Sequence, residues 1–407
     1  MSPAPKSFAP AVPSAASPAP RVLLISPQPF FQWRGSPLRV RFDAQALAES
    51  GYAVDLLVMP VGDDFPIPGV TCHRAPNIVR AKNLPIGPSP AKAILDVSLY
   101  FKASALARRN AYAVIHGIED AGPIAAVLAR RHRAKFVFEK HSDPASYKKK
   151  SSPVRNLVMA AYRRVERFSL TRADAIIATG PALAQQARDA APDTPVHHIF
   201  DIPSSLVEPD PAQAAAVRDS WNLPPDAVVA LYVGSFASYQ GLDLLFDAIP
   251  AACAANPNLR FAVIGGTPAQ IAERTAQMKA AGCADRVFFP DRVHPDALPH
   301  TLAAADIMLS PRIAGDNTPL KLLDYFKSGR PIVACDNPAN RLVVGDTAAL
   351  LCPPTPSDFA SAVATLASDP DARTRIAAAG LSLYRSTYNY ANYKHLLSSA
   401  YSSLLQK

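Results

Sequence analysis

The sequence predicts two α/β domains of the doubly wound, Rossmann-like kind that face each other across a cleft. With 407 residues, the chain is too long for one ordinary domain and suits two. From residue 21 onward, short apolar runs of strand length alternate with helical patterns. A stretch rich in Pro, Ser and Asp at 202–224 interrupts this alternation and is interpreted as a linker. Because ligands of parallel sheets bind beyond the carboxyl ends of the strands, loops of both domains should line the cleft.

The N-terminal domain is predicted at 21–205, after a Pro/Ala-rich tail at 1–20 that we expect to be disordered. Apolar runs predict its strands at 21–26, 53–59, 112–116, 135–140 and 174–179. Helices are expected at 38–50, 89–109, 121–132 and 152–171. The first of them should stop at Gly51, since glycine commonly ends a helix.

The C-terminal domain is predicted at 206–385 and repeats the alternation. Its strands are expected at 227–233, 260–265, 286–289, 306–310, 331–335 and 348–352. An aromatic-bearing helix at 384–405 closes the chain, and we expect residues 386–407 to pack back toward the N-terminal domain.

Composition narrows the class of protein. The five cysteines are odd in number and far apart, which argues against a disulfide framework or a structural zinc site and suits a reducing cytosol. No run approaches the roughly 18 apolar residues that cross a bilayer. We therefore expect a cytoplasmic protein, either soluble or peripheral on the cytoplasmic membrane face. Nucleic acid is not expected as a partner, because no recognised binding motif or aromatic stacking platform is present.

A basic segment at 148–172 contributes much of the net charge of +9. It could bind an anionic membrane surface, or it could be only a solvated helix face. Apolar residues recur through it at helical spacing, and we expect most of this stripe to pack on the sheet. The stripe comprises Val154, Leu157, Val158, Ala161, Val165 and Phe168.

The segment 310–335 predicts a phosphate-binding helix that follows a strand. Pro319 suits a first helical position, with Asn317 or Thr318 as the cap. A helix that begins at the carboxyl end of a strand offers free N–H groups to a diphosphate. Lys321, one turn into the helix, would add a full positive charge.

Two carboxylates flank this helix start. Asp324 lies deeper in the helix, where it could accept hydrogen bonds from a ribose diol, and Asp316 in the preceding loop could accept from hydroxyls of a donor sugar. The simpler alternative is that these residues only cap and solvate a surface helix.

The spacing of these carboxylates resembles the donor-site signature of glycosyltransferase family 4, retaining enzymes of GT-B architecture. The family has E-x7-E before a Gly-x-Pro-[IV]-[IV]-A strand, and this chain has Asp316-x7-Asp324 before GRPIVA at 329–334. The resemblance implies that Asp316 faces the transferred sugar as a catalytic residue, that Asp324 holds the ribose, and that Leu320 lines the donor site. Arg312 is not a usual member of the motif, and it either replaces a phosphate contact or pairs with a nearby acid.

A second resemblance lies in the turn at 231–249, which is similar to the family's YVGRLxxxKGLDLLLEA. Gly234 matches the glycine of this motif, but the motif's two basic residues are not matched. The family's Arg and Lys, which bind the pyrophosphate, are Ser235 and Gln240 here. The phosphates should then depend on backbone N–H groups, Lys321 and Arg312; the alternative is a weakened site. The Gly-Gly turn at Gly265 is expected to complete the nucleotide pocket.

In the N-terminal half, Gly35 lies in the loop after the first strand, where the resemblance implies a close approach to the donor or acceptor. His141 follows the strand at 135–140, where the family has a histidine close to the transferred sugar; the alternative is a capped loop histidine. His116 and Glu119 are lesser candidates for the cleft wall.

Taken with these motifs, the resemblance implies retaining transfer of a hexose-type sugar from a UDP- or GDP-sugar to a hydroxyl acceptor, with no metal required. The acceptor would be a carbohydrate or a lipid-linked molecule, as in cell-surface glycan or glycolipid assembly. The loss of the Arg/Lys pair also leaves open a non-catalytic nucleotide-sugar-binding or scaffold protein of the same fold. A dehydrogenase is disfavoured, because no G-x-G-x-x-G follows the first strand of either domain.

Overall fold

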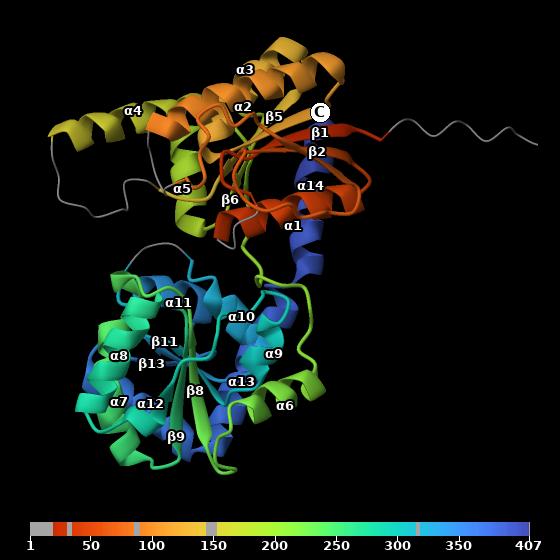
Figure 1. Cartoon of the computed structure of the whole chain (residues 1–407). Helices are drawn as coiled ribbons and strands as arrows, with labels where there is room; N and C mark the ends of the chain where they lie inside the picture. Colours follow the sequence, from red (N-terminus) through yellow and green to blue (C-terminus); the bar gives the residue numbers. More distant parts are fainter. Residues whose placement is uncertain (1–18, 31–34, 85–89, 144–152, 315–317, 407) are drawn as a thin grey trace, which may run out of the picture.

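The chain folds into two α/β halves, each built around one parallel sheet (Figure 1). The computed structural model describes residues 19–30, 35–84, 90–143, 153–314 and 318–406. The N-terminal sheet has the strand order β3-β2-β1-β4-β5-β6-β7, and the C-terminal sheet has β10-β9-β8-β11-β12-β13. In both, the chain runs outward in one direction from the first strand and then in the other, which is the doubly wound topology. The predicted fold class is confirmed.

The N-terminal strands are β1 (Arg21–Ile25), β2 (Ala53–Val58), β3 (Val70–Arg74), β4 (Val114–Ile118), β5 (Lys135–Lys140), β6 (Ala175–Ala178) and β7 (Val196–His198). The helices of this half are α1 (Gly35–Glu49), α2 (Pro90–Arg109), α3 (Gly122–His132), α4 (Pro153–Leu170) and α5 (Pro181–Ala190), with a 3-10 turn η1 (Glu119–Ala121). The sequence patterns missed β3 and β7. Both are short edge strands, and partial exposure leaves them without the continuous apolar run of a central strand.

The C-terminal strands are β8 (Val228–Val233), β9 (Leu259–Ile264), β10 (Val287–Phe288), β11 (Ile307–Ser310), β12 (Ile332–Cys335) and β13 (Leu350–Cys352). Its helices are α6 (Pro211–Ser220), α7 (Leu242–Ala255), α8 (Pro268–Ala280), α9 (Leu298–Ala303), α10 (Lys321–Ser328), α11 (Pro338–Val344), α12 (Pro356–Ser368) and α13 (Pro370–Ser386), with 3-10 turns η3 (Ser238–Gln240) and η4 (Ala284–Arg286). The final helix of the chain is α14 (Tyr390–Leu405).

The segment 202–224 was interpreted as a linker, but part of it forms helix α6. The Asp210 side chain accepts a hydrogen bond from the Gln213 backbone N–H, and Pro211 takes the first helical position. Asp followed by Pro therefore marks a helix start here rather than a turn.

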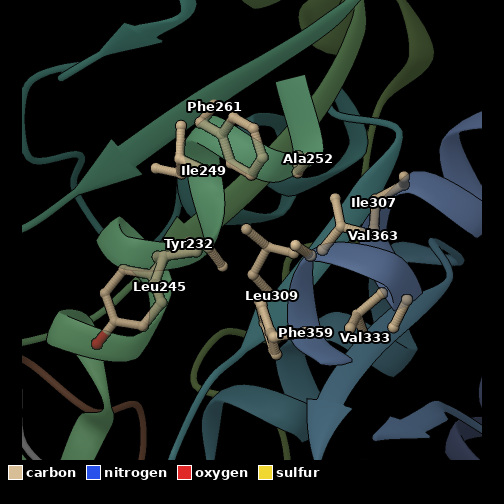
Figure 2. Close-up of a cluster of buried hydrophobic side chains, with 14 of the residues drawn as sticks. Tyr232, Leu245, Ile249, Ala252, Phe261, Ile307, Leu309, Val333, Phe359 and Val363 are labelled. Carbon is tan, nitrogen blue, oxygen red and sulfur yellow. The ribbon is translucent and has the colours of Figure 1, made fainter. Parts of the chain in front are cut away.

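Each half has its own apolar core, so each sheet is held by the helices that cover it. In the C-terminal half, α7 and α12 pack on one face of the sheet (Figure 2). Burying one such side chain stabilises the fold by about 1.5–3 kcal/mol. The residues in this contact include Ile249, Phe261, Leu309, Val333 and Phe359, all with 1% exposure or less.

The chain crosses between the halves twice. The first crossing follows β7, and the second joins α13 to α14, where the sequence predicted one uninterrupted helix. Asn389 accepts a hydrogen bond from the Asn392 backbone N–H and so begins a separate helix. Rings of the two crossings touch, with the centroids of Phe200 and Tyr388 5.5 Å apart.

Helix α14 lies beside α1 of the N-terminal half (Figure 1). Its side chains Tyr393, Leu397 and Tyr401 are buried in the N-terminal core. In the described part of the chain, no helix is both long and apolar enough to cross a membrane.

Candidate functional site

An open cleft lies where the two halves meet. Its walls bring together four of the predicted site residues, Gly35 and His141 from the N-terminal half and Thr318 and Leu320 from the C-terminal half. Gly35 allows the close approach, because a Cβ at this position would lie 2.7 Å from Leu320 Cδ1. Further lining residues are Ser36, Arg39, Asp143, Thr179 and Asp201.

The helix at the donor side begins later than predicted. Helix α10 starts at Lys321, and Leu320, not Asn317 or Thr318, is its N-cap residue. The backbone N–H groups of Leu322 and Leu323 bond to the carbonyls of Pro319 and Leu320, which is a tight turn of the 3-10 kind. Proline and threonine patterns locate a helix start only to within such a turn. Asn317 and Asp316 lie outside the described residues.

Lys321, the first residue of α10, is the predicted phosphate-binding cation. Its Nζ donates to Gln240 Oε1 at 2.7 Å and lies 4.2 Å from the centre of the Tyr232 ring. Gly234 gives the ammonium room, because a Cβ there would lie 2.9 Å from Nζ. The described residues provide no carboxylate partner. Burial, together with the positive charge of Arg312, lowers the pKa of Lys321 to about 7.

Arg312 is a second buried cation near the same position, in the loop after β11. Its Nε donates to the Ala314 carbonyl at 2.8 Å, and its guanidinium lies over the Tyr239 ring. Its positive charge contributes to the lowered pKa of Lys321.

The glycine-rich turns meet at the ends of β8 and β9. A Cβ on Gly265 would lie 1.9 Å from the Gly234 carbonyl oxygen, so only glycine fits there. The Ser235 carbonyl accepts from the Tyr232 hydroxyl at 2.8 Å, which fixes the turn.

Asp324 is engaged by the first interdomain crossing. Its Oδ1 accepts from the Ser204 backbone N–H at 2.7 Å and from the Ser204 hydroxyl at 2.9 Å. Burial raises the pKa of Asp324 to about 6, although these hydrogen bonds oppose the shift. A ribose contact at Asp324 stays a prediction, and it would have to share or replace the bonds from Ser204.

On the N-terminal side, His141 belongs to a buried ionic group that the sequence analysis missed. His141 Nε2 lies 3.1 Å from Glu139 Oε1, and Arg39 Nε donates to the same carboxylate. Arg39 also bonds Asp201 at 3.1 Å. Burial disfavours a charged imidazole, but Glu139 reverses this and raises the pKa of His141. A charged residue inside the apolar strand KFVFEK was the available signal.

The two lesser candidates lie away from the cleft lining. His116 is fully buried, with Nε2 3.0 Å from Glu139 Oε2 and Nδ1 2.7 Å from the Tyr401 hydroxyl. Glu119 accepts from the Ser142 hydroxyl at 2.7 Å and lines a small separate cavity.

The expectation for the apolar stripe of the basic segment was wrong. On α4, Leu157 is 73% exposed, Val158 43% and Val165 48%, so these residues do not pack on the sheet. Figure 1 shows why, since α4 extends past the edge of the N-terminal half. Arg163, Arg164 and Arg167 are exposed on the same helix; Lys148, Lys149 and Lys150 lie outside the described residues.

Family comparisons cover both halves of the chain. A family model described as "Glycosyl transferase 4-like domain" matches residues 34–201, and one described as "Glycosyl transferases group 1" matches 227–369. The chain is 25% identical, over 89% of its length and 83% of the relative, to a D-inositol 3-phosphate glycosyltransferase of Geodermatophilus obscurus. It is 24% identical, over 74% of its length and 82% of the relative, to an alpha-D-kanosaminyltransferase of Streptomyces kanamyceticus.

Solved structures show the same fold. Sucrose-phosphate synthase from Thermosynechococcus elongatus matches with a TM-score of 0.74 and 20% identity, over 95% of this chain and 99% of that one. Anabaena HepE, solved in complex with UDP and glucose, matches with a TM-score of 0.71 and 17% identity, over 94% and 99%.

Proposed function

Because the chain belongs to the family 4 glycosyltransferases of GT-B architecture, we propose that it transfers a hexose-type sugar from a UDP- or GDP-sugar to an acceptor hydroxyl, with retention of anomeric configuration. The observation that carries the donor proposal is the partly buried Lys321 at the start of α10, with Arg312 nearby. A diphosphate at this helix start would gain the ammonium charge and the positive end of the helix dipole.

The same contacts would stabilise the leaving group. Negative charge grows on the nucleoside diphosphate as the glycosidic bond breaks, and fixed positive groups in a buried site lower the barrier to that step. Gln240, which stands where the family has a lysine, keeps a role here because it orients the Lys321 ammonium. We propose that Lys321 and Arg312 compensate for the missing Arg/Lys pair.

We propose that the transferred sugar lies in the cleft between His141 and Leu320, the residue before Lys321. Asp316 would face this sugar and Asp324 would bind the ribose. HepE, a protein of the same fold, has been solved with UDP-glucose, which supports UDP-sugars as the first donors to test.

The acceptor side of the proposal includes the exposed face of α4. Leu157, Val158 and Val165 combine apolar surface with the nearby arginines, a pattern that suits reversible contact with an anionic membrane. Each basic residue near such a surface contributes about 1 kcal/mol. This supports a lipid-linked acceptor; a soluble carbohydrate is the alternative.

The test is a transfer assay with a panel of UDP- and GDP-sugars and carbohydrate acceptors, followed by NMR of the product's anomeric coupling. We expect one donor to give transfer with retained configuration. A protein that binds a nucleotide sugar but neither transfers nor hydrolyses it would contradict the proposal, and an inverted product would contradict its stereochemical part.

A further inference from the structure

Glu139 occupies the centre of a fully buried polar cluster that ends at the cleft. Its Oε1 faces Arg39 Nε and His141 Nε2, and its Oε2 faces His116 Nε2 at 3.0 Å. His116 Nδ1 lies 2.7 Å from the hydroxyl of Tyr401, which comes from α14 at the end of the chain. The cluster thus joins the cleft to the C-terminal helix.

The position of each proton in this cluster follows from hydrogen-bond chemistry. Burial opposes a charge on Glu139, but Arg39 and His141 hold the pKa of its carboxyl well below the usual range, so both oxygens can only accept. The nitrogens nearest these oxygens, Nε2 of His116 and Nε2 of His141, lie at ion-pair distance from them without a well-directed hydrogen bond, and the charge of the carboxylate favours a proton on each. The Tyr401 hydroxyl and His116 Nδ1 share a hydrogen bond at 2.7 Å, and when the proton of a neutral His116 is on Nε2 the hydroxyl is the donor.

The two ring nitrogens of His141 differ in their surroundings. Neither makes a hydrogen bond among the described residues, but Nε2 lies 3.1 Å from the Glu139 carboxylate, whereas no described carboxylate lies at ion-pair distance from Nδ1, and the His141 side chain lines the cleft. A buried polar atom without a partner is costly, and at a ligand site a bound ligand can supply the partner.

We propose that Glu139 is a positioning residue for sugar transfer: it keeps a proton on His141 Nε2 and so reserves Nδ1 for a substrate hydroxyl. Tyr401, acting through His116, holds the carboxylate in the required orientation. The inference rests on the proposed function only in placing a substrate hydroxyl beside His141. In this proposal α14 helps to orient His141 through Tyr401, although α14 contributes no described residue to the cleft lining.

The pH dependence of His141 is set by every charged or titratable group that faces the cluster. These groups are Arg39 and Asp43 on α1, His116 on β4, Glu119 on η1, Glu139 on β5, Asp201 in the first crossing, and Tyr393 and Tyr401 on α14. Glu139 is the anion in contact with His141, so its removal should move the His141 titration to lower pH.

The chain contains a matched control. Asp55 on β2 is also a buried carboxylate held by an arginine, a histidine and a tyrosine, namely Arg21 at 2.8 Å, His73 at 2.7 Å and Tyr112 at 2.9 Å. It lies outside the cleft lining. Asp55→Asn therefore removes the same kind of interaction without reaching His141.

The experiment combines NMR of protein labelled with ¹⁵N-histidine with pH profiles of kcat. His141→Gln identifies the His141 signals. As the pH rises and wild-type His141 becomes neutral, we expect Nδ1 to lose its proton and Nε2 to keep its proton. Glu139→Gln should lower kcat at least about tenfold, as loss of an outer-shell partner commonly does. It should also move the His141 midpoint to lower pH and leave the donor KM nearly unchanged.

Tyr401→Phe keeps the Glu139 carboxylate, so it should lower kcat and the His141 midpoint less than Glu139→Gln does. Asp55→Asn should lower only the melting temperature. A wild-type His141 that carries its single proton on Nδ1 when neutral would overturn the inference, even if Glu139→Gln fails to fold. So would a Glu139→Gln enzyme with the wild-type pH profile. Absence of transfer by the wild-type protein would instead refute the proposed function, and the NMR measurement would still test the tautomer.

Discussion

Lys321 gives a prediction whose size can be worked out from its surroundings. In the unfolded chain its pKa is 10.5, and in the folded, empty protein burial lowers the pKa to about 7. A change of this size corresponds to a free-energy cost on the order of 5 kcal/mol for keeping the ammonium charged in the empty site. A nucleoside diphosphate beside Nζ would remove much of that cost. Binding should therefore raise the pKa of Lys321 and take up a proton.

The sign of the pH dependence follows from this uptake. Below pH 7 the ammonium is already charged, so Lys321 contributes its full effect to binding. Above pH 7 the empty protein loses the proton and the complex retains it, so affinity should fall by up to about tenfold per pH unit. Folding stability changes in the opposite sense, because the unfolded chain binds more protons between pH 7 and 10.5. That stability should rise with pH across this window.

The assay is calorimetric titration of UDP and GDP from pH 7.5 to 9 in buffers with different ionisation enthalpies. In this range the last proton of a phosphate, with a pKa of about 6, is already lost. We expect uptake approaching one proton in the wild type and none in Lys321→Met. Lys279→Met, at an exposed lysine of α8, should behave as wild type. Uptake that persists in Lys321→Met, or is missing from the wild type, would refute the assignment.

Three further predictions concern other parts of the molecule. Asp324→Ala should weaken nucleotide binding by about 1.5–3 kcal/mol in calorimetry if its carboxylate holds the ribose. Unchanged affinity would contradict the ribose contact and show that Asp324 only binds Ser204 of the first crossing. Asp43→Asn should raise the melting temperature more at pH 8 than at pH 5. Burial raises the pKa of Asp43 to about 8, so the native protein loses stability as the pH rises from about 4 to 8, and the substitution removes that loss. Equal increases of the melting temperature at both pH values would contradict this prediction. Changing Lys148, Lys149 and Lys150 to Ser should reduce co-sedimentation with anionic liposomes at low salt. A wild-type protein that does not bind such liposomes would make a soluble acceptor the better proposal.

The sequence predicted the architecture well because central parallel strands are buried on both faces and read as continuous apolar runs. The same rule fails at sheet edges, which explains why β3 and β7 were missed. The start of α10 was placed too early, since Pro319 precedes a tight turn rather than the helix itself. These errors are local and do not change the topology.

Contacts were predictable where a motif is contiguous and not where the fold assembles them. Gly234, Gln240 and Lys321 come from two motifs and contact one another, although none of them lines the described cleft, and their part in donor binding stays a prediction. The partners of His141 come from α1, β4, β5 and the distant helix α14, and no local pattern connects them. The engagement of Asp324 by Ser204 depends on the path of the first crossing, which composition does not reveal.

The contact between Phe200 and Tyr388 has a mechanical consequence. Both covalent connections between the halves pass through this one place, so the halves can rotate about a hinge there without stretching the chain. Such a rotation would separate or join Gly35 and Leu320 while it leaves each core intact. The balance between open and closed forms is then set by the surfaces that meet in the cleft, and a ligand that contacts both sides shifts it toward closure.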